Sequence, residues 1–237
     1  MVRYAEYTTA EKSPIKRWSH STRFRVALAV LQPLDSQSLL DFGTADALMI
    51  KLVKATHPAV ACVGYDPHMD EGAGDVSAEF RDVELVTDIG ALAGRRFDIV
   101  TCFETLEHFT TRAANERVDE IVGLAKPDGR IVVSVPIEIG PASLFKNVVR
   151  AAIGKPHPGT TVASVMASLF YRPVERPAEK AGGYIPSHVG FDYRVVPGLF
   201  AARGWHCVRT HYSPLGGAGP LFNSQALFEF RRREGLS

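Results

Sequence analysis

Residues 38–48 read Ser-Leu-Leu-Asp-Phe-Gly-Thr-Ala-Asp-Ala-Leu. The apolar run ends at Gly43, and apolar residues then recur at helical spacing from Ala47 to Ala55. This pattern predicts a buried strand, a tight turn and a helix. A turn of small residues lets the backbone approach a ligand closely, and the helix after it begins with unpaired N–H groups that suit a pyrophosphate or a carboxylate. The stretch is therefore the first candidate for a ligand site.

The alternation of strands and helices continues along the chain. Strands that are apolar throughout imply a parallel sheet covered on both faces. The last two predicted strands can pair as an antiparallel end of that sheet. We therefore expect an α/β fold, a Rossmann-like three-layer sandwich with a mostly parallel seven-stranded sheet and an antiparallel C-terminal strand. The further strands are predicted over 59–65, 83–86, 97–103, 130–135, 205–212 and 224–230, and helices over 21–31, 112–125 and 191–203.

The composition fits one globular domain. Of the 237 residues, 46% are hydrophobic and 22% are charged. A chain of this length and composition can bury a substantial core without disulfides or structural metals. We assign residues 1–237 to a single domain. Within it, 1–36 form a lead-in and helix. Residues 137–190, rich in Pro, Gly and basic residues, form an insertion or lid over the substrate side.

The same numbers exclude several classes of protein. Cys62, Cys102 and Cys207 lie far apart, so neither a zinc module nor a disulfide framework is indicated. The net charge of +1 and the lack of a basic accessory domain argue against a nucleic-acid partner. The polar N-terminus and the absence of a run of about 20 apolar residues predict a soluble, cytoplasmic protein. An apolar helical face over 144–153 with basic neighbours fits either a lid helix or peripheral contact with a membrane surface.

Two acidic residues follow predicted strands where a nucleoside would bind. Asp66 comes 23 positions after Gly43, a spacing that suits hydrogen bonds to ribose hydroxyls. Asp88 could accept from an adenine amino group, with Ile89 in apolar contact, or could cap the next helix. A dinucleotide fingerprint would require glycine at Ala45 and Leu48, so a dehydrogenase is disfavoured.

The densest cluster of reactive residues follows the strand over 97–103. Glu104, Glu107 and His108 would share one helical face if the strand turned directly into a helix. His108 could act as a general base because its reference pKa lies near neutral pH. The alternative is a capped helix start with its charges in water.

The joint spacing of these motifs resembles class I S-adenosylmethionine-dependent methyltransferases, most closely the branch of the ubiquinone-pathway O-methyltransferases. The resemblance implies S-adenosylmethionine as cofactor. It also implies that Ala45 and Ala47, where the family usually has glycine, crowd the methionine end of the cofactor. The motifs that carry the resemblance are Leu40-Asp41-x-Gly43-x-Ala45-Asp46-Ala47, Gly64-Tyr65-Asp66, Phe97-Asp98-Ile99-Val100, Glu104-x-Leu106-Glu107-His108, Leu124-Ala125-Lys126-Pro127-Asp128-Gly129-Arg130 and Ser134-Val135-Pro136.

The resemblance also assigns roles to individual residues. The methionine moiety would lie against Gly43 and its neighbours, the ribose against Asp66 and Pro67, and the adenine between Asp88 and Ile89. Phe103 and Glu104 would border the place where the methyl group leaves. The neighbours of Gly43 in this prediction are Asp41, Phe42, Thr44 and Ala45.

The sequence Glu104-x-x-Glu107-His108 also resembles the metal-binding motif of small-RNA 2′-O-methyltransferases, with His188 in the place of their later histidine. Two carboxylates and two imidazoles could hold a divalent ion that positions a hydroxyl. Many metal-free relatives share the motif, so we expect the site to work without a metal. If an ion binds, its ligands would be Glu104, Glu107, His108 and His188.

The working hypothesis is methyl transfer to an oxygen of a small or carbohydrate-like acceptor. His108 or His188 would take the hydroxyl proton, and Glu104 or Glu107 would orient that base. One alternative is a non-catalytic relative that keeps the fold as a binding subunit, which Ala45 and Ala47 would favour. The other is an RNA methyltransferase. The oligomeric state stays open.

Overall fold

The computed structural model describes residues 14–33, 35–70, 72–141 and 161–232, which contain a seven-stranded sheet of order β3-β2-β1-β4-β5-β7-β6. Strands β1 to β5 pair in parallel, whereas β7 is antiparallel to both β5 and β6. The predicted α/β, Rossmann-like sheet with an antiparallel C-terminal strand is therefore confirmed. The strands are β1 (Ser38–Phe42), β2 (Ala61–Tyr65), β3 (Glu84–Val86), β4 (Phe97–Phe103), β5 (Ala125–Pro136), β6 (Trp205–Ser213) and β7 (Gln225–Arg232).

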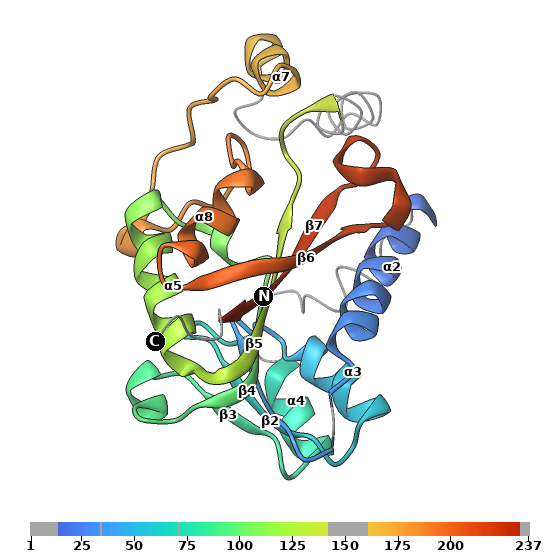
Figure 1. Cartoon of the computed structure of the whole chain (residues 1–237), viewed down its shortest axis with the longest axis vertical. Coiled ribbons are helices and arrows are strands. Elements are labelled where there is room, and N and C mark those ends of the chain that lie inside the picture. The colour runs from blue at the N-terminus through green and yellow to red at the C-terminus, as the bar shows by residue number, and fades with distance from the viewer. Residues whose placement is uncertain (1–13, 34, 71, 142–160, 233–237) are drawn as a thin grey trace.

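Helices cover both faces of the sheet. Neighbouring residues of a strand point to opposite faces, and both faces of these strands are apolar, so each face is buried under helices. Leu40 belongs to the apolar cluster under α5 and α8, whereas Leu39 belongs to the cluster under α2, α3 and α4. Figure 1 shows α5 and α8 on one side of the sheet and α2 and α3 on the other. The helices are α2 (Pro14–Leu31), α3 (Leu48–Thr56), α4 (Gly72–Glu79), α5 (Thr111–Leu124), α7 (Val162–Leu169) and α8 (Val196–Ala201).

Four helices differ from the sequence prediction, and one of them is α7, which was not predicted. Helix α2 begins at Pro14 instead of residue 21, and proline is favourable in a first helical turn. Helix α4 was not predicted, because its sequence GAGDVSAE is dominated by small residues. The expected helix over 191–203 is shorter: a 3₁₀ turn, Tyr193–Val195, precedes α8. The strand expected over 130–135 is longer: β5 begins at Ala125 and includes Pro127 and Gly129, next to an irregular register with β4.

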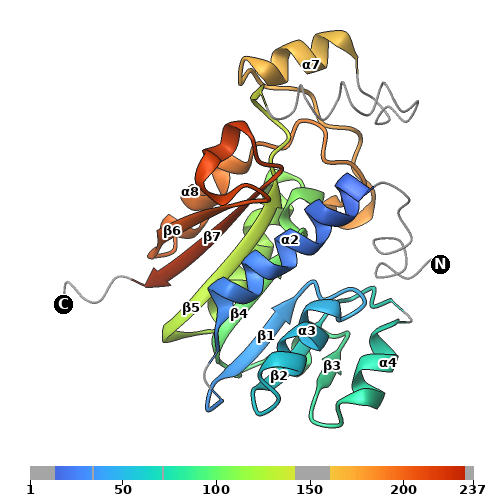
Figure 2. The ribbon, with the colours of Figure 1, turned by 90° about the vertical axis from the view of Figure 1, so that its right-hand side faces the viewer.

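The described parts of the segment predicted as an insertion, 137–141 and 161–190, lie beyond the carboxyl ends of the parallel strands (Figure 1). Helix α7, capped by reciprocal hydrogen bonds between Thr161 and Ser164, stands above that edge in both views (Figures 1 and 2). The chain then returns to the sheet, where Phe109 and Tyr184 form an antiparallel bridge. The amphipathic helix predicted over 144–153 lies outside the described residues.

Within the described part of the chain, no helix combines the length and the apolar character that crossing a bilayer requires.

Candidate active site

The turn after β1 requires glycine at Gly43. Its φ of 80° is in the left-handed region. A Cβ at this position would lie 2.4 Å from Oγ1 of Thr105, in the loop after β4. The turns after β1 and β4 therefore touch, and together they form the floor at the carboxyl edge of the sheet.

Asp41 supports this turn from within the core. Its side chain is only 3% exposed and accepts hydrogen bonds from the hydroxyls of Thr101, at 2.6 Å, and Thr44, at 2.8 Å. Burial raises the pKa of Asp41 to about 6, although the two hydroxyls oppose the shift. Its contacts make Asp41 a positioning residue for the turn; Phe42 is likewise buried in the core.

Asp66 lies where the sequence places it, against the first turn. Its Oδ2 accepts from the Ala45 backbone N–H at 3.1 Å, and its Oδ1 accepts from His68 N–H at 2.8 Å. The side chain is half-buried, and Pro67 beside it is exposed. A carboxylate oxygen has two lone pairs, so both oxygens keep acceptor capacity for a ribose hydroxyl.

The two alanines that replace glycine differ in surroundings. Both have left-handed backbones, with φ of 48° at Ala45 and 57° at Ala47. Ala47 is fully buried in the cluster under α2 and α3, so its methyl group points into the core. The expected crowding of the cofactor by Ala47 therefore has no basis in this structure; only Ala45 is partly exposed.

Asp88 caps the 3₁₀ helix Ile89–Leu92. Its side chain accepts a hydrogen bond from Gly90 N–H at 2.9 Å. This is the helix-capping role that the sequence offered as the alternative to an adenine contact. Ile89 is half-buried and packs against the core. The Asp66 N–H donates to the carbonyl of Val86, so the ends of β2 and β3 lie side by side. Both acids thus border one edge of the sheet, and an adenine contact stays a prediction.

The chain after β4 does not enter a helix directly. Glu104 has a left-handed backbone with φ of 50°, a 3₁₀ turn spans Leu106–His108, and α5 begins only at Thr111. The prediction that Glu104, Glu107 and His108 share one helical face is therefore wrong. A left-handed backbone strains a non-glycine residue, and residues with such strain are concentrated at functional sites.

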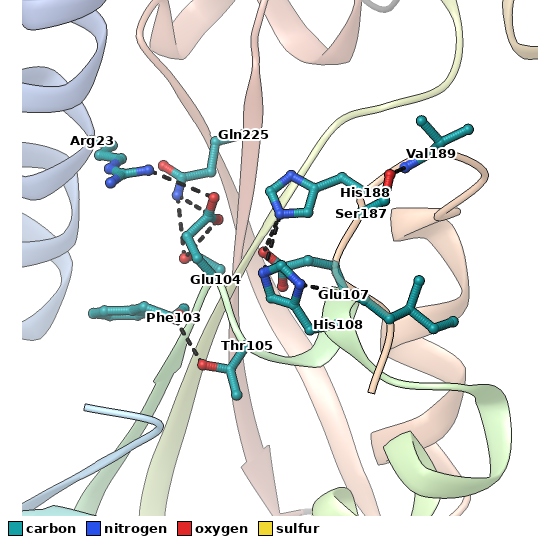
Figure 3. Close-up of polar contacts among 12 residues, drawn as sticks. Arg23, Phe103, Glu104, Thr105, Glu107, His108, Ser187, His188, Val189 and Gln225 are labelled. Atoms are coloured by element: carbon teal, nitrogen blue, oxygen red, sulfur yellow. Dashed lines mark hydrogen bonds and ion pairs between the residues drawn. The ribbon is translucent and has the colours of Figure 1, made fainter. Parts of the chain in front are cut away.

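The carboxylate of Glu104 faces α2 and the antiparallel strand. Its Oε1 accepts from Gln225 Nε2 at 2.9 Å, and its Oε2 lies 3.6 Å from Arg23 Nη1. Ser134 completes this group by donating to Oε1 at 3.4 Å. Figure 3 shows Glu104 with Arg23 and Gln225, apart from the histidines. Phe103, half-buried, packs toward α2 and α3 just before it.

His108 and His188 meet across the site. Their Nε2 atoms lie 3.2 Å apart, and Nδ1 of His108 lies 3.0 Å from the carbonyl oxygen of Ile185. A carbonyl only accepts, so Nδ1 carries the proton and the Nε2 lone pair of a neutral His108 faces His188. Burial lowers the pKa of His108, although the Ile185 carbonyl opposes the shift.

Glu107 lies beneath the two histidines. It is fully buried, and neither carboxylate oxygen has a hydrogen-bond partner among the described residues. Its Oε1 lies 3.9 Å from His188 Nε2. Burial raises the pKa of Glu107 well above its usual value, and the nearby Glu104 carboxylate adds to this effect. Of the predicted metal-ligand set, Glu107, His108 and His188 come together within 4.8 Å, without Glu104.

Sequence reasoning missed the residues that support this cluster. Arg176 donates to the backbone carbonyls of Glu107 and Phe109, and Tyr184 stacks on His108 with ring centroids 5.3 Å apart. Both lie in the irregular segment before His188, where no periodicity marks them. Arg23 and Gln225 are far from Glu104 in the sequence and carry no motif.

The chain belongs to the methyltransferase domain family, whose model matches residues 16–157. This confirms the class of protein that the motifs predict; the narrower likeness to the ubiquinone-pathway branch stays a prediction. The comparison with curated proteins gave no match.

Solved structures of the same fold include several methyltransferases. One is magnesium protoporphyrin IX methyltransferase of Synechocystis PCC 6803 with bound S-adenosylhomocysteine (17% identity, 94% of this chain, 89% of that chain, TM-score 0.58). Another is 1,6-didemethyltoxoflavin N1-methyltransferase of Burkholderia thailandensis, with its acceptor and S-adenosylhomocysteine (15%, 99%, 92%, TM-score 0.57). A third is the mitomycin 7-O-methyltransferase (18%, 98%, 61%, TM-score 0.56). At these identities the likeness concerns the fold.

Proposed function

We propose that this chain transfers the methyl group of S-adenosylmethionine to an oxygen of a small or saccharide-like acceptor. The family supports methyl transfer, and structures of similar fold hold S-adenosylhomocysteine. Acceptors named in those structures are small molecules, at nitrogen in one and at oxygen in another. The choice of oxygen rests on the side chains of this chain.

The cofactor would lie at the carboxyl edge formed by the turns after β1, β2 and β4. Two observations fit it: Gly43 packs closely on Thr105 and so joins the turns after β1 and β4 at this edge, and Asp66 keeps acceptor capacity beside them. In this assignment Gly43, Thr44 and Ala45 border the methionine part, Asp66 and Pro67 the ribose, and Asp88 and Ile89 the adenine. The cofactor supplies an electrophilic methyl group on a sulfonium, whose sulfur keeps the bonding electron pair.

The observation that carries the assignment to oxygen is the pair of facing imidazoles. A hydroxyl is a weak nucleophile until its proton is removed, and a neutral histidine can take that proton near neutral pH. The Nε2 atoms of His108 and His188 lie 3.2 Å apart. His108 lies three residues after Thr105, whose side chain packs against Gly43 in the turn after β1. Glu107 lies beside His188.

Glu104 has a different role from the one expected. It does not contact either histidine in this structure but holds Arg23 and Gln225. We assign it to the wall of the acceptor site, where it ties α2 and β7 to the end of β4. Positioning of donor and acceptor in a fixed line supplies much of the rate in such reactions.

The direct test is a screen for S-adenosylhomocysteine formation with phenols, hydroxy acids and sugars, with amines of matched size as controls. The proposal predicts turnover with a hydroxyl acceptor and a methyl group on oxygen in the product, identified by mass spectrometry and NMR. Turnover confined to the amines would contradict the assignment to oxygen.

A further inference from the structure

We propose that Glu107, His108 and His188 bind one divalent transition-metal ion through one carboxylate oxygen and two imidazole Nε2 atoms. Binding of the ion stands on the geometry of these three residues alone. Only its action on the acceptor hydroxyl rests on the proposed function.

The spacing of the three groups matches a shared ion. Around a tetrahedral metal with bonds of about 2.0–2.1 Å, two ligand atoms lie about 3.3 Å apart. The two Nε2 atoms are separated by 3.2 Å, and Oε1 of Glu107 lies 3.9 Å from His188 Nε2. All three ligand atoms lie within 4.8 Å of one another, so small side-chain movements suffice to place an ion between them.

The buried carboxylate calls for a cation. Burying a carboxylate without hydrogen bonds is costly, and neither oxygen of Glu107 has a hydrogen-bond partner among the described residues; Oε1 only approaches His188 Nε2 at 3.9 Å. Arg176, the nearby guanidinium, donates to the backbone carbonyls of Glu107 and Phe109. A metal ion at the histidines would bring a further positive charge next to this carboxylate.

The histidine tautomer is already set for binding a metal. Metal-bound histidines commonly donate their other ring N–H to a backbone carbonyl, which fixes the ring and leaves a lone pair toward the ion. His108 does this through Nδ1 to Ile185, at 3.0 Å. The facing Tyr184 ring stacks on the same imidazole and limits its rotation.

The donor set selects the kind of metal. Two imidazole nitrogens and one carboxylate favour Zn²⁺, Fe²⁺ or Co²⁺, whereas Mg²⁺ and Ca²⁺ prefer an all-oxygen environment. Three protein ligands leave a position for an acceptor oxygen. Glu104 is not among the ligands, because its carboxylate contacts Gln225 and Arg23 and lies apart from the histidines (Figure 3).

The ion would change how the hydroxyl is activated. His108 and His188 would hold the ion through their Nε2 atoms, and the ion would lower the pKa of a hydroxyl bound to it, so that the proton could pass to water. The acceptor oxygen would then form the bond to the methyl carbon while the carbon–sulfur bond breaks and its electron pair stays on sulfur.

The test is a titration of tag-free, chelator-treated protein with Zn²⁺ and Co²⁺, without cofactor or acceptor. Calorimetry is expected to give one ion per chain, and Co²⁺ is expected to show the visible absorption of a site with nitrogen ligands. His188→Gln and Glu107→Gln should each weaken binding by at least about tenfold. His206→Gln and Asp128→Asn, at exposed positions away from the cluster, are the controls and should leave the affinity unchanged.

Wild-type protein that takes up no ion, or controls that lose binding as much as the ligand variants, would overturn the site. Thermal melts of each variant identify those that fail to fold. If His188→Gln or Glu107→Gln does not fold, His108→Gln is used in its place, and its Co²⁺ absorption should be weaker than that of wild type. Failure of this inference is distinct from failure of the proposed function. Metal-free protein that methylates a hydroxyl at the wild-type rate keeps the function and removes the ion.

Discussion

The Nε2 atoms of His108 and His188 lie 3.2 Å apart although 80 residues separate the two histidines in the chain. The first is fixed by the 3₁₀ turn after β4, and the second arrives on the segment that returns from α7. Backbone hydrogen bonds between the two segments, including Ile185 N–H to the His108 carbonyl at 2.6 Å, set the register of this meeting. The proposed reactive centre therefore forms only when the segment over 183–188 packs against the loop after β4.

Replacing either histidine should separate chemistry from cofactor binding. His108→Gln and His188→Gln are each expected to lower kcat by about 100-fold or more, because activation of the hydroxyl is lost. The affinity for S-adenosylmethionine should stay unchanged, since the cofactor turn lies on β1 and β2. His206→Gln, at an exposed position, is the control for both measurements. Equal losses of kcat and cofactor affinity would point to general damage instead of a role in activation.

The buried carboxylate of Glu107 should lower the free energy of unfolding of the metal-free protein. Glu107→Met keeps a similar volume and removes two unpartnered oxygens, so the free energy of unfolding should rise by about 1–3 kcal/mol. Glu104→Met is the matched comparison and should lower stability, because it breaks the hydrogen bonds from Gln225 and Ser134. Urea denaturation after chelator treatment measures both. A destabilised Glu107→Met protein would mean that the carboxylate has partners that stabilise the fold.

Asp41 should make stability depend on pH between its two pKa values. Its pKa is about 6 in the folded protein against an ordinary 3.8, so folding favours the protonated form. The stabilising contribution is full below about pH 4 and is lost as the pH rises through 6. Wild type should therefore lose about 2 kcal/mol relative to Asp41→Asn between pH 4 and pH 7.

Comparing the two proteins in urea at each pH cancels the titration of all other groups. A difference that does not change with pH would show that Asp41 keeps its ordinary pKa despite its burial.

The two left-handed alanines offer a matched pair. Glycine relieves the backbone at either position, but only Ala47 buries its methyl group completely. Ala45→Gly should be at least as stable as wild type. In Ala47→Gly the free energy of unfolding should fall by about 1 kcal/mol, because removing the buried methyl group leaves a cavity. Denaturation in urea gives both values. The reverse order would show that the strain resides mainly at Ala47.

The sheet was predictable because its strands are continuous apolar runs and its turns carry glycine or acids at the strand ends. The packing of Gly43 on Thr105 and the meeting of the two histidines follow from that topology. The left-handed backbone at Glu104 was not predictable, because no residue preference marks it, and it moves the carboxylate from the histidines to Gln225. Arg23 and Gln225 come from opposite ends of the chain, and Arg176 lies in a segment without periodicity.

The central claim is that the turn at Gly43 and the carboxylate of Asp66 together hold S-adenosylmethionine, and calorimetric titration with this cofactor tests it most directly. We expect wild type to bind one molecule per chain. Asp66→Asn should bind it at least about tenfold more weakly, because loss of the charge weakens the hydrogen bonds to the ribose. The exposed Asp128→Asn protein should bind like wild type. Wild-type protein that gives no saturable heat, or Asp66→Asn that binds as tightly as wild type, would contradict the account.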